Sequence, residues 1–438
     1  MKYLTLIYYD TFARFFSSIE NAVKQQNPTA EFLHLAIFPS GFLYMRAQGS
    51  KVKLLPWDLK TAPDSTIIAS DTELDRITKY HSVVGTKYGE RYKATLRERA
   101  RKYINLWTSL VKDYDPDIVI FSGDTRIAAE SLQYCLDRME HRAKRYYVEQ
   151  GPNGTTILDD RGVNANCSFR EKATLLTGEG YTPEKIVKSK RFKRNPVYRG
   201  VDVALIAILR LLSKVPPEWD TISLKKYPSH AYQSCIEHGS SNSTALAKEI
   251  LIALQVPDDA NNIHHNPLNI GDSALLTMVL EATSKTELPV RVREHPLYRR
   301  RYTNKLYEQL KNSNRALLSN STLEHDLEKA AVVITINSMT GLDAYLKNIP
   351  VVVLGNSFYD HLPGIERSSD ATSLNSIISR LITTGMSSSL DNFDPARIFT
   401  EMRIRYFIPG HYLDENLSIP ATAIASILVS KNNLGKAL

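Results

Sequence analysis

The chain has 438 residues, of which 43% are hydrophobic and 23% are charged, and its formal net charge is +8. Because a domain usually holds roughly 100 to 200 residues, this length predicts two domains or slightly more. No run of about 18 apolar residues occurs, which argues against a membrane-spanning helix. Residues 1–10 lack the small-residue cleavage site of a signal peptide, so we expect a first strand there and a cytoplasmic protein.

The basic charge indicates an acidic partner, and nucleic acid, anionic lipid, a nucleotide-linked sugar or an acidic polysaccharide would all fit it. We expect no nucleic-acid partner, because aromatic and basic residues are not interleaved at a recognisable spacing. The cysteines, Cys135, Cys167 and Cys235, lack the paired spacing of a zinc site or a disulfide framework. They are expected to be ordinary buried thiols.

Strand-like and helix-like segments alternate in the first half of the chain. One of them is an apolar strand that ends in Gly123-Asp124. This alternation predicts a parallel sheet covered by helices on both faces. In chain order, we expect a strand at 1–10, a helix at 11–24, an extended segment at 32–38, one or two helices within 71–112, a strand at 117–124, a helix at 125–140 and a strand at 145–148.

The second half repeats this plan, which predicts an α/β protein with two Rossmann-like domains facing a central cleft. In such sheets, ligands bind beyond the carboxyl ends of the strands. The expected strands are 248–256, 289–293, 315–318, 332–336 and 351–354, and the expected helices are 271–284, 300–312, 322–330 and 340–347. The expected domains are an N-terminal domain at 1–200, an interdomain segment at 201–235, a C-terminal domain at 236–415 and a helix or tail at 416–438.

A basic run lies at the junction and precedes an apolar segment, residues 201–212. One interpretation is an interfacial helix that docks on anionic lipid, so that the protein is peripheral on the inner membrane. The other is a solvated linker followed by a buried helix. The basic residues are Lys185, Lys188, Lys190, Arg191, Lys193 and Arg194.

Three carboxylates lie within a dozen residues of one another after the strand at 145–148. Glu149 follows this strand directly and precedes Gln150-Gly151, while Asp159 and Asp160 form an acidic turn ten residues later. Carboxylates in this setting can supply a base or a nucleophile for an acetal-forming reaction. The alternative for Asp159-Asp160-Arg161-Gly162 is an ordinary hairpin turn.

Two further strand ends carry polar groups that suit a phosphate. His295-Pro296 follows one strand, and a histidine there can donate a hydrogen bond to a phosphate or to a leaving group. Asn337, Ser338, Thr340 and Gly341 follow the next core strand and begin a helix, where hydroxyls and backbone amides can point to one spot. The alternative is that Asn337 or Ser338 only caps the helix.

No metal is expected. His264-His265 are adjacent, so both cannot easily bind one ion from an extended segment, and no acid lies at ligand spacing around them. A cluster of arginines near His295 could hold an anionic sugar or a phosphate, or could simply be a solvated helix start. Its members are Arg293, Arg299, Arg300 and Arg301.

These motifs together resemble the capsule polysaccharide biosynthesis family, which contains the bacterial β-Kdo glycosyltransferases. The resemblance extends from about Asp117 to Ile365. It departs from the family where Gln150 replaces a second acid and Pro152-Asn153-Gly154-Thr155 follows. The ordered motifs are Glu149-Gln150-Gly151, Leu158 to Asn166, Leu254 to Asp259, His295-Pro296, Asn337 to Ala344, Pro350 to Gly355 and Tyr359-Asp360.

The resemblance implies a GT-B fold and a CMP-β-Kdo donor, with the donor bound by the C-terminal domain and a glycolipid or polysaccharide acceptor bound by the N-terminal one. His295, Pro296, Asn337, Ser338, Thr340 and Gly341 would bind the donor, without a metal or another cofactor. If configuration is retained, one of Glu149, Asp159 and Asp160 attacks the anomeric carbon, and Glu149 is the first choice. The alternatives are a transferase for another CMP- or CDP-linked donor, such as CMP-sialic acid, and a noncatalytic binding subunit of capsule assembly.

Overall fold

The computed structural model describes residues 1–59, 62–85, 89–183, 189–211, 230–232, 235, 248–386 and 392–433. The chain forms two compact units, each described by itself below. Unit 1 contains Met1–Ser168, Lys185–Leu224 and Tyr406–Leu438, and unit 2 contains Phe169–Glu184 and Lys225–Arg405. Both are Rossmann-like α/β domains, so the predicted α/β class with two such domains is confirmed.

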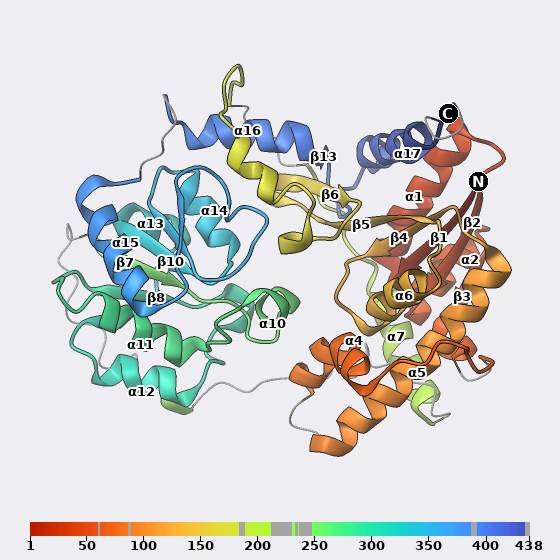
Figure 1. Ribbon diagram of the computed structural model, residues 1–438, viewed down its shortest axis with the longest axis horizontal. Coiled ribbons are helices and arrows are strands. Elements are labelled where there is room, and N and C mark those ends of the chain that lie inside the picture. Colours follow the sequence, from red (N-terminus) through yellow and green to blue (C-terminus); the bar gives the residue numbers. More distant parts are fainter. Residues whose placement is uncertain are drawn as a thin grey trace. The chain divides into compact units, whose positions relative to one another are not determined.

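Unit 1 is built on a seven-stranded sheet in the order β13-β6-β5-β4-β1-β2-β3 (Figure 1). The five strands from β5 to β3 are parallel, whereas β6 and β13 run antiparallel to their neighbours. The sequence had predicted only parallel strands here. The strands are β1 (Lys2–Ile7), β2 (Glu31–Ala36), β3 (Val52–Leu54), β4 (Ile118–Ser122), β5 (Lys144–Gln150), β6 (Thr155–Asp159) and β13 (Phe407–Pro409).

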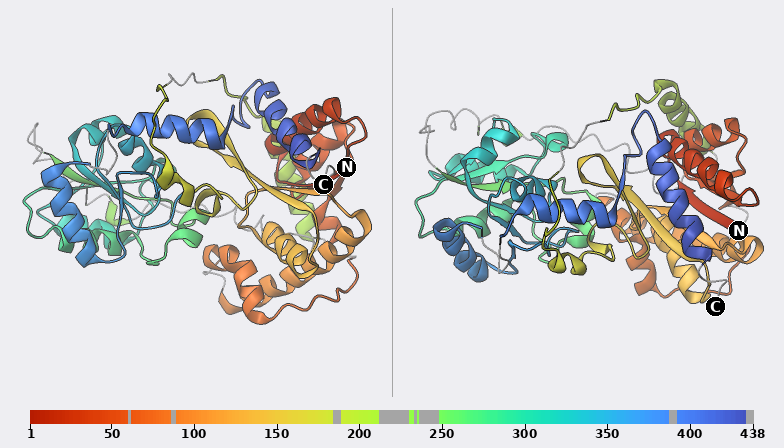
Figure 2. Two further views of the ribbon diagram at one scale, coloured as in Figure 1. Left: turned by 45° about the horizontal axis from the view of Figure 1, so that its top comes forward. Right: turned by 90° about the horizontal axis from the view of Figure 1, so that it is seen from above.

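Helices cover both faces of this sheet, because its central strands are buried on both sides. One apolar cluster joins alternate residues of β1 to α5 and α6, and the other joins the intervening residues to α1 and α17. Helices α1 and α17 lie side by side although they come from opposite ends of the chain (Figures 1 and 2). The helices are α1 (Asp10–Gln26), α2 (Pro39–Ala47), α3 (Leu55–Asp58), α4 (Asp71–Val84), α5 (Gly89–Tyr114), α6 (Ile127–Arg138), α7 (Pro196–Leu211) and α17 (Ser418–Asn433).

Unit 2 is built on a six-stranded, fully parallel sheet in the order β12-β11-β10-β7-β8-β9. The chain starts in the middle at β7, proceeds outwards to β9, and then returns to β10 on the other side of β7. This is the strand order of a dinucleotide-binding Rossmann domain. The strands are β7 (Glu249–Ala253), β8 (Val290–Arg293), β9 (Ala316–Leu318), β10 (Ala330–Thr335), β11 (Val351–Val353) and β12 (Ile365–Arg367).

Among the described strands of unit 2, β12 alone was not predicted from the sequence. Its neighbours lie close to their predicted positions, and the helices between them pack on the apolar core of the sheet. The helices are α10 (Ala260–His265), α11 (Asp272–Ala282), α12 (Asn304–Asn312), α13 (Leu323–Lys329), α14 (Met339–Tyr345), α15 (Ala371–Thr384) and α16 (Pro395–Tyr406).

The two units differ from the expected domain bounds in two segments. Residues 169–184 belong to unit 2, where Arg170 forms an ion pair with buried Asp360. Residues 406–438 belong to unit 1, because β13 pairs with β6 and α17 packs against α1. Of the expected interdomain segment, 201–235, the part up to Leu211 is helix α7 of unit 1, and most of the rest lies outside the described residues.

Candidate functional site

The carboxyl edge of a sheet is the side at which the carboxyl ends of its parallel strands lie. In unit 2, the strand order reverses between β7 and β10, so a crevice is expected at the carboxyl edge of this strand pair. Gln255 follows β7 and Asn337 follows β10. Their side chains hydrogen-bond to each other across the reversal point. The predicted Asn-Ser-Met-Thr-Gly turn therefore lies where a Rossmann domain binds its ligand.

Asn337 is engaged inside the fold. It is 9% exposed, and its side-chain nitrogen donates to the backbone oxygens of Asn261, His265 and Asn356 at 3.1 to 3.3 Å. These bonds join the loops that follow β7, β10 and β11. Asn337 therefore shapes this edge of the sheet, and its predicted contact with a donor stays a prediction.

Ser338 and Gly341 also have structural tasks. The Ser338 hydroxyl accepts a hydrogen bond from the backbone N–H of Thr340 at 3.3 Å. This is the bond expected if Ser338 caps the helix. Gly341 leaves room for Tyr359, whose hydroxyl would lie 2.6 Å from an added Cβ. Thr340 is only half-buried, so its hydroxyl is the better placed of this set to meet a ligand.

His295 follows β8 and is held from two sides. Its Nδ1 accepts the backbone N–H of Leu297 at 3.2 Å, and its own backbone N–H donates to the Tyr302 hydroxyl at 3.0 Å. Burial lowers the pKa of His295, although Asp259 opposes this shift. A neutral ring that accepts at Nδ1 carries its proton at Nε2, so it can donate a hydrogen bond to a phosphate oxygen. Pro296 begins the short turn Pro296–Tyr298 and is exposed.

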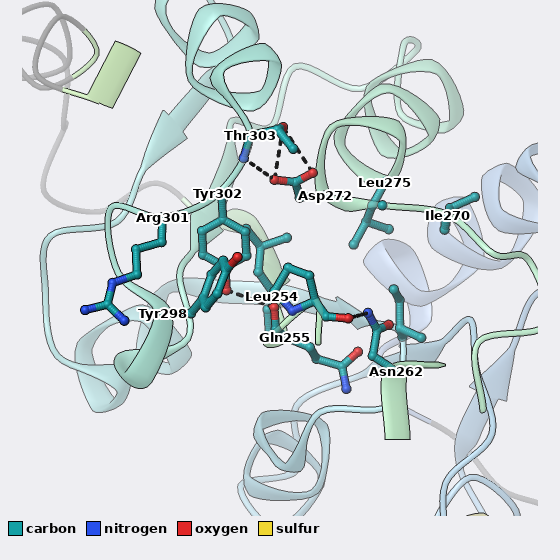
Figure 3. A pocket seen from close by; sticks show the side chains of 14 residues that line it. Leu254, Gln255, Asn262, Ile270, Asp272, Leu275, Tyr298, Arg301, Tyr302 and Thr303 are labelled. Atoms are coloured by element: carbon teal, nitrogen blue, oxygen red, sulfur yellow. Dashed lines mark hydrogen bonds between the residues drawn. The ribbon is translucent and has the colours of Figure 1, made fainter. Parts of the chain in front are cut away.

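A cavity of about 410 Å³ opens at the carboxyl ends of β7 and β8, next to the reversal point (Figure 3). Tyr298 and Tyr302 stand edge to face on one side, with ring centroids 4.9 Å apart. On another side, Asp272 accepts hydrogen bonds from the backbone and hydroxyl of Thr303. The lining is Ala253, Leu254, Gln255, Pro257, Asn262, Ile270, Gly271, Asp272, Leu275, Tyr298, Arg301, Tyr302, Thr303 and Ile336.

This cavity suits a flat, partly polar group such as a nucleobase or a nucleoside. Aromatic and aliphatic side chains form most of its wall, and a few polar atoms can fix an orientation. The Tyr302 hydroxyl donates to the backbone oxygen of Gln255 at 3.0 Å and so ties the end of β8 to the end of β7. Neither tyrosine was predicted as a site residue, and their positions three and seven residues after His295 were the only signal in the sequence.

The carboxyl edge of unit 1 carries Glu149 at the end of β5. This side chain is half-buried, and its Oε1 accepts the backbone N–H of Gln150 at 2.9 Å. Its Oε2 lies 3.9 Å from the position of a Cβ added to Gly123, which follows β4 and has φ +79°. Burial raises the pKa of Tyr412 to about 12, and the negative charge of Glu149 adds to this effect. The Tyr412 hydroxyl, whose pKa Glu149 influences, is thus neutral.

Asp159 stabilises its own turn through hydrogen bonds. It is 6% exposed and accepts hydrogen bonds from the backbone N–H groups of Arg161, Gly162 and Ser168 and from the Ser168 hydroxyl, at 2.7 to 3.1 Å. These bonds support the turn interpretation. Asp160, by contrast, is exposed. Of the three predicted carboxylates, Glu149 combines partial burial with a strand-end position.

Asp124, which follows Gly123 after β4, is a fourth carboxylate at this edge. Its Oδ2 accepts the Val163 backbone N–H at 3.0 Å and the Asn166 side chain at 2.8 Å. Its Oδ1 is buried and has no hydrogen-bond partner among the residues that the structure describes. Burial raises the pKa of this carboxyl, and the two hydrogen bonds only partly oppose the shift. The strand-end rule that selected Glu149 would also have selected Asp124.

Three of the four carboxylates influence the pKa of one thiol. Burial raises the pKa of Cys167 far above its usual value, and the charges of Asp159, Asp124 and Glu149 add to that shift. All three cysteines are buried and free, as the sequence predicted. Within the described ranges, no group of three or more histidine, cysteine, aspartate or glutamate side chains is placed to hold a metal ion.

The described part of the basic junction is largely paired with carboxylates of unit 1. Lys190 pairs with Glu415, and Arg191 with Asp414. Arg194 pairs with both Asp10 and Asp202. Lys185 and Lys188 lie outside the described residues. Val197, Val203 and Ile208 of α7 are more than half exposed. Among the described helices, none has both the length and the apolar character to cross a bilayer.

The sequence profile of a protein family described as "Capsule polysaccharide biosynthesis protein" matches residues 156–376, just over half of the chain. The chain belongs to this family. The resemblance predicted from the motifs is thereby confirmed. No curated protein matches the chain.

Several solved structures are similar over nearly the whole chain. KpsC from Thermosulfurimonas dismutans, a β-Kdo 2,7 transferase, has a TM-score of 0.44 at 13% identity and covers 99% of this chain and 100% of its own. UDP-GlcNAc 2-epimerase from Neisseria meningitidis, bound to UDP-GlcNAc, has a TM-score of 0.35 at 14% identity, with coverages of 99% and 100%. A glycosyltransferase from Rickettsia africae has a TM-score of 0.34 at 12% identity, with coverages of 99% and 98%.

The region matched to the capsule polysaccharide biosynthesis family contains most of the predicted site. It includes Asp159 and Asp160, both strand ends with His295 and Thr340, and the wall of the cavity. Glu149 lies seven residues before the matched region. Its assignment therefore rests on its position at the carboxyl edge of unit 1, not on the family match.

Proposed function

We propose that the protein is a glycosyltransferase that transfers β-Kdo, with retention of configuration, from CMP-β-Kdo to a glycolipid or saccharide acceptor in bacterial capsule or surface polysaccharide biosynthesis. The observation that carries the proposal is the cavity at the strand reversal of unit 2, in a chain that belongs to the capsule polysaccharide biosynthesis family. A nucleotide donor fits a Rossmann domain at this place.

In this proposal, unit 2 holds the donor. The cytidine occupies the cavity between Tyr302 and Asp272, and the phosphate lies over the ends of β8 and β10. There, His295 Nε2–H and the Thr340 hydroxyl donate hydrogen bonds to phosphate oxygens. These bonds strengthen as the phosphate gains negative charge, so they lower the barrier to departure of CMP without a metal.

Retention requires two displacements. A Glu149 carboxylate oxygen attacks the anomeric carbon, the bond from that carbon to the phosphate oxygen breaks, and CMP leaves with the electron pair. An acceptor hydroxyl then attacks the same carbon and loses its proton to a base. The ester bond to Glu149 breaks, and the carboxylate is regenerated. Glu149 is preferred over Asp159 because the lone pairs of Asp159 are engaged in its turn.

The test is release of CMP from CMP-β-Kdo generated in situ, with and without a Kdo-terminated glycolipid acceptor. Wild-type protein should release CMP in an acceptor-dependent manner. Glu149→Gln should lower this rate at least about 1,000-fold while the melting temperature stays unchanged. Glu31→Gln, at an exposed glutamate of the same unit, is the matched control and should retain full activity.

The same assay on Asp159→Asn and Asp160→Asn completes the comparison. Loss of turnover in Asp160→Asn with full activity in Glu149→Gln would identify Asp160 as the nucleophile instead of Glu149. Binding of cytidine nucleotides without Kdo transfer would indicate another CMP- or CDP-linked donor, such as CMP-sialic acid. Absence of all cytidine-nucleotide binding would indicate a noncatalytic subunit of capsule assembly.

Association with an anionic membrane surface through the segment from Lys185 to Arg199 is kept as a separate proposal. The exposed apolar side chains of α7 support it, whereas the ion pairs of Lys190, Arg191 and Arg194 leave fewer basic groups for lipid. Partitioning onto vesicles with and without anionic lipid tests it, and equal partitioning would contradict it.

A further inference from the structure

A second polar cluster lies at the carboxyl edge of unit 2, on the far side of β10 from the cavity. Arg367 is the last residue of β12, and Asp360 lies in the loop between β11 and β12. Arg170, from the segment 169–184 of the same unit, joins them. The function proposed above does not use any of these groups.

The buried partner of this cluster is Asp360, which is 1% exposed. Arg170 approaches it with two parallel donors: Nε lies 2.8 Å from Oδ1, and Nη2 lies 2.6 Å from Oδ2. This two-bond geometry is the strong form of a guanidinium–carboxylate pair. Arg170 is therefore the main partner that balances the charge of Asp360.

Arg367 is a second cation beside the same carboxylate, and it is less well paired. Its Nε lies 3.6 Å from Asp360 Oδ2, and its Nη2 donates to Asn356 Oδ1 at 3.2 Å. Its Nη1 lies 3.1 Å from His361 Nε2. Burial lowers the pKa of His361, and the charges of both arginines contribute, although Asp360 and Glu171 oppose the shift. A neutral His361 can accept the bond from Arg367.

The cluster of Arg170, Arg367, Asp360 and neutral His361 thus has one positive charge in excess. The Arg367 side chain is 45% exposed, and a guanidinium has five N–H donors, so part of its donor fork remains available. The neighbouring carboxylate, Glu366, is engaged by Arg380 at 2.7 Å. An excess positive charge and exposed N–H donors are the features that suit a small planar anion.

The strand register places this cluster in line with the proposed donor site. Arg367 pairs with Val353, Val353 with Thr335, Thr335 with Ala253, and Ala253 with Arg293. Strand β12 is two strands from β10, or about 10 Å along the edge. A shared hydrogen-bond path also joins the two: Asn337 donates to the Asn356 backbone oxygen, and the Asn356 side chain accepts from both arginines.

We propose that the Arg367 cluster is an anion subsite that recognises the carboxylate of a nucleotide-linked sugar acid, and that Arg367 determines specificity for this donor class. The inference rests on the function proposed above, because the nucleoside is assigned to the cavity and the phosphate to the ends of β8 and β10. A sugar acid carries one further anion, and the next cationic place along the same edge is this cluster. Arg367 binds and does not take part in bond making.

The experiment compares the binding of three probes to the full chain by calorimetry: CMP, freshly prepared CMP-β-Kdo, and UDP-GlcNAc as a nucleotide with a neutral sugar. Wild-type protein should bind CMP-β-Kdo more tightly than CMP. Arg367→Ala should weaken CMP-β-Kdo binding about 10- to 100-fold and leave CMP binding unchanged, because CMP does not reach β12. Arg397→Ala, which removes a comparably exposed arginine of α16 in the same unit, is the control and should change neither affinity.

If Arg367 had only a structural role, Arg367→Ala would weaken the binding of CMP and of CMP-β-Kdo by the same factor. This result would overturn the inference. It would also be overturned if Arg367→Ala changed neither affinity, or if UDP-GlcNAc bound as tightly as CMP-β-Kdo and lost affinity equally. Failure of the proposed function is seen separately, as wild-type protein that binds CMP-β-Kdo selectively without transferring the sugar. Wild-type protein that binds no cytidine nucleotide would overturn both proposals.

Discussion

The two sheets share one strand order around their reversal points, but different chemical groups follow their strands. In unit 1, the strand ends carry carboxylates, with Asp10 after β1, Asp124 after β4 and Glu149 at the end of β5. In unit 2, three strand ends carry nitrogen and hydroxyl donors, with His295 after β8, Thr340 after β10 and Arg367 at the end of β12.

This difference teaches that a shared fold does not fix the chemistry of its edge. Donors stabilise a bound anion, whereas carboxylates serve as bases or nucleophiles. A transferase with an anionic leaving group requires both kinds of group. In this chain, the carboxylates proposed for chemistry lie in unit 1 and the donors proposed for binding lie in unit 2, so variants of unit 2 should change binding and variants of unit 1 should change chemistry.

The largest stability effect is expected in unit 2 from Arg170→Ala. It leaves the carboxylate of Asp360 buried without its two-bond partner, which should lower the free energy of unfolding by about 3–5 kcal/mol. Urea unfolding measures the change. Arg380→Ala, which breaks an exposed pair, should stay within about 0.5 kcal/mol. Equal losses of unfolding free energy in both variants would show that the Arg170–Asp360 pair stabilises the fold no more than an exposed pair does.

A somewhat smaller effect is expected in unit 1 at acid pH from Glu20. Burial alone would raise the pKa of Glu20, but hydrogen bonds from His34, Lys24 and Ser50 outweigh it and lower the pKa to about 2. A carboxylate with a lowered pKa stabilises the fold above about pH 4.5, and the contribution disappears as the pH falls towards about 2. It amounts to roughly 3 kcal/mol.

Glu20→Gln should therefore remove this part of the acid dependence of unfolding, whereas Glu31→Gln, at an exposed glutamate on β2, should preserve it. Urea unfolding at a series of pH values between about 5 and 2 measures both. Identical pH profiles for wild type and Glu20→Gln would contradict the expectation.

A smaller effect is expected in unit 2 from His295→Asn. An asparagine oxygen can still accept the Leu297 backbone N–H, but the Nε2–H donor is lost, so the turnover number should fall about 10- to 100-fold. Because burial lowers the pKa of His295, its neutral form is the stable one. Wild-type stability should therefore decline as the pH falls below about 6.5, and this component should be absent in the variant.

The smallest effect is expected from two glycines of unit 1 with the same backbone angle. Gly123 and Gly154 both have φ +79°, but only an alanine at Gly123 would place its Cβ beside the Glu149 carboxylate. Each substitution to alanine should cost about 1–2 kcal/mol through backbone strain. Turnover should fall several-fold in Gly123→Ala alone. An equal loss in Gly154→Ala would show that the effect is general destabilisation.

The order of elements in unit 2 could be predicted because each of its inner strands is an apolar run between polar turns. Strand β12 escaped prediction since Ile365–Arg367 is short and half polar and is defined only by its pairing with β11. In unit 1, the antiparallel strand β13 could not be predicted for a similar reason: its partner β6 lies about 250 residues earlier in the chain.

The candidate site was predictable only in part. The strand-end rule selected Glu149 and His295, and it would have selected Asp124 had it been applied to β4. It could not show that Asp159 is occupied by the amides of its own turn, because this depends on backbone geometry. Nor could it show that Tyr302 reaches back to Gln255 across 47 positions.

The position of β13 also has a consequence for synthesis of the chain. Strand β6 ends at Asp159, and its outer neighbour begins at Phe407. At about 5–20 residues per second, a ribosome needs roughly 10–50 s to make the intervening residues. During this interval, all of unit 2 is synthesised while β6 still presents an unpaired edge. Newly made chains therefore pass through a period in which this edge is open to pairing with another polypeptide, and chaperone binding would be most useful then.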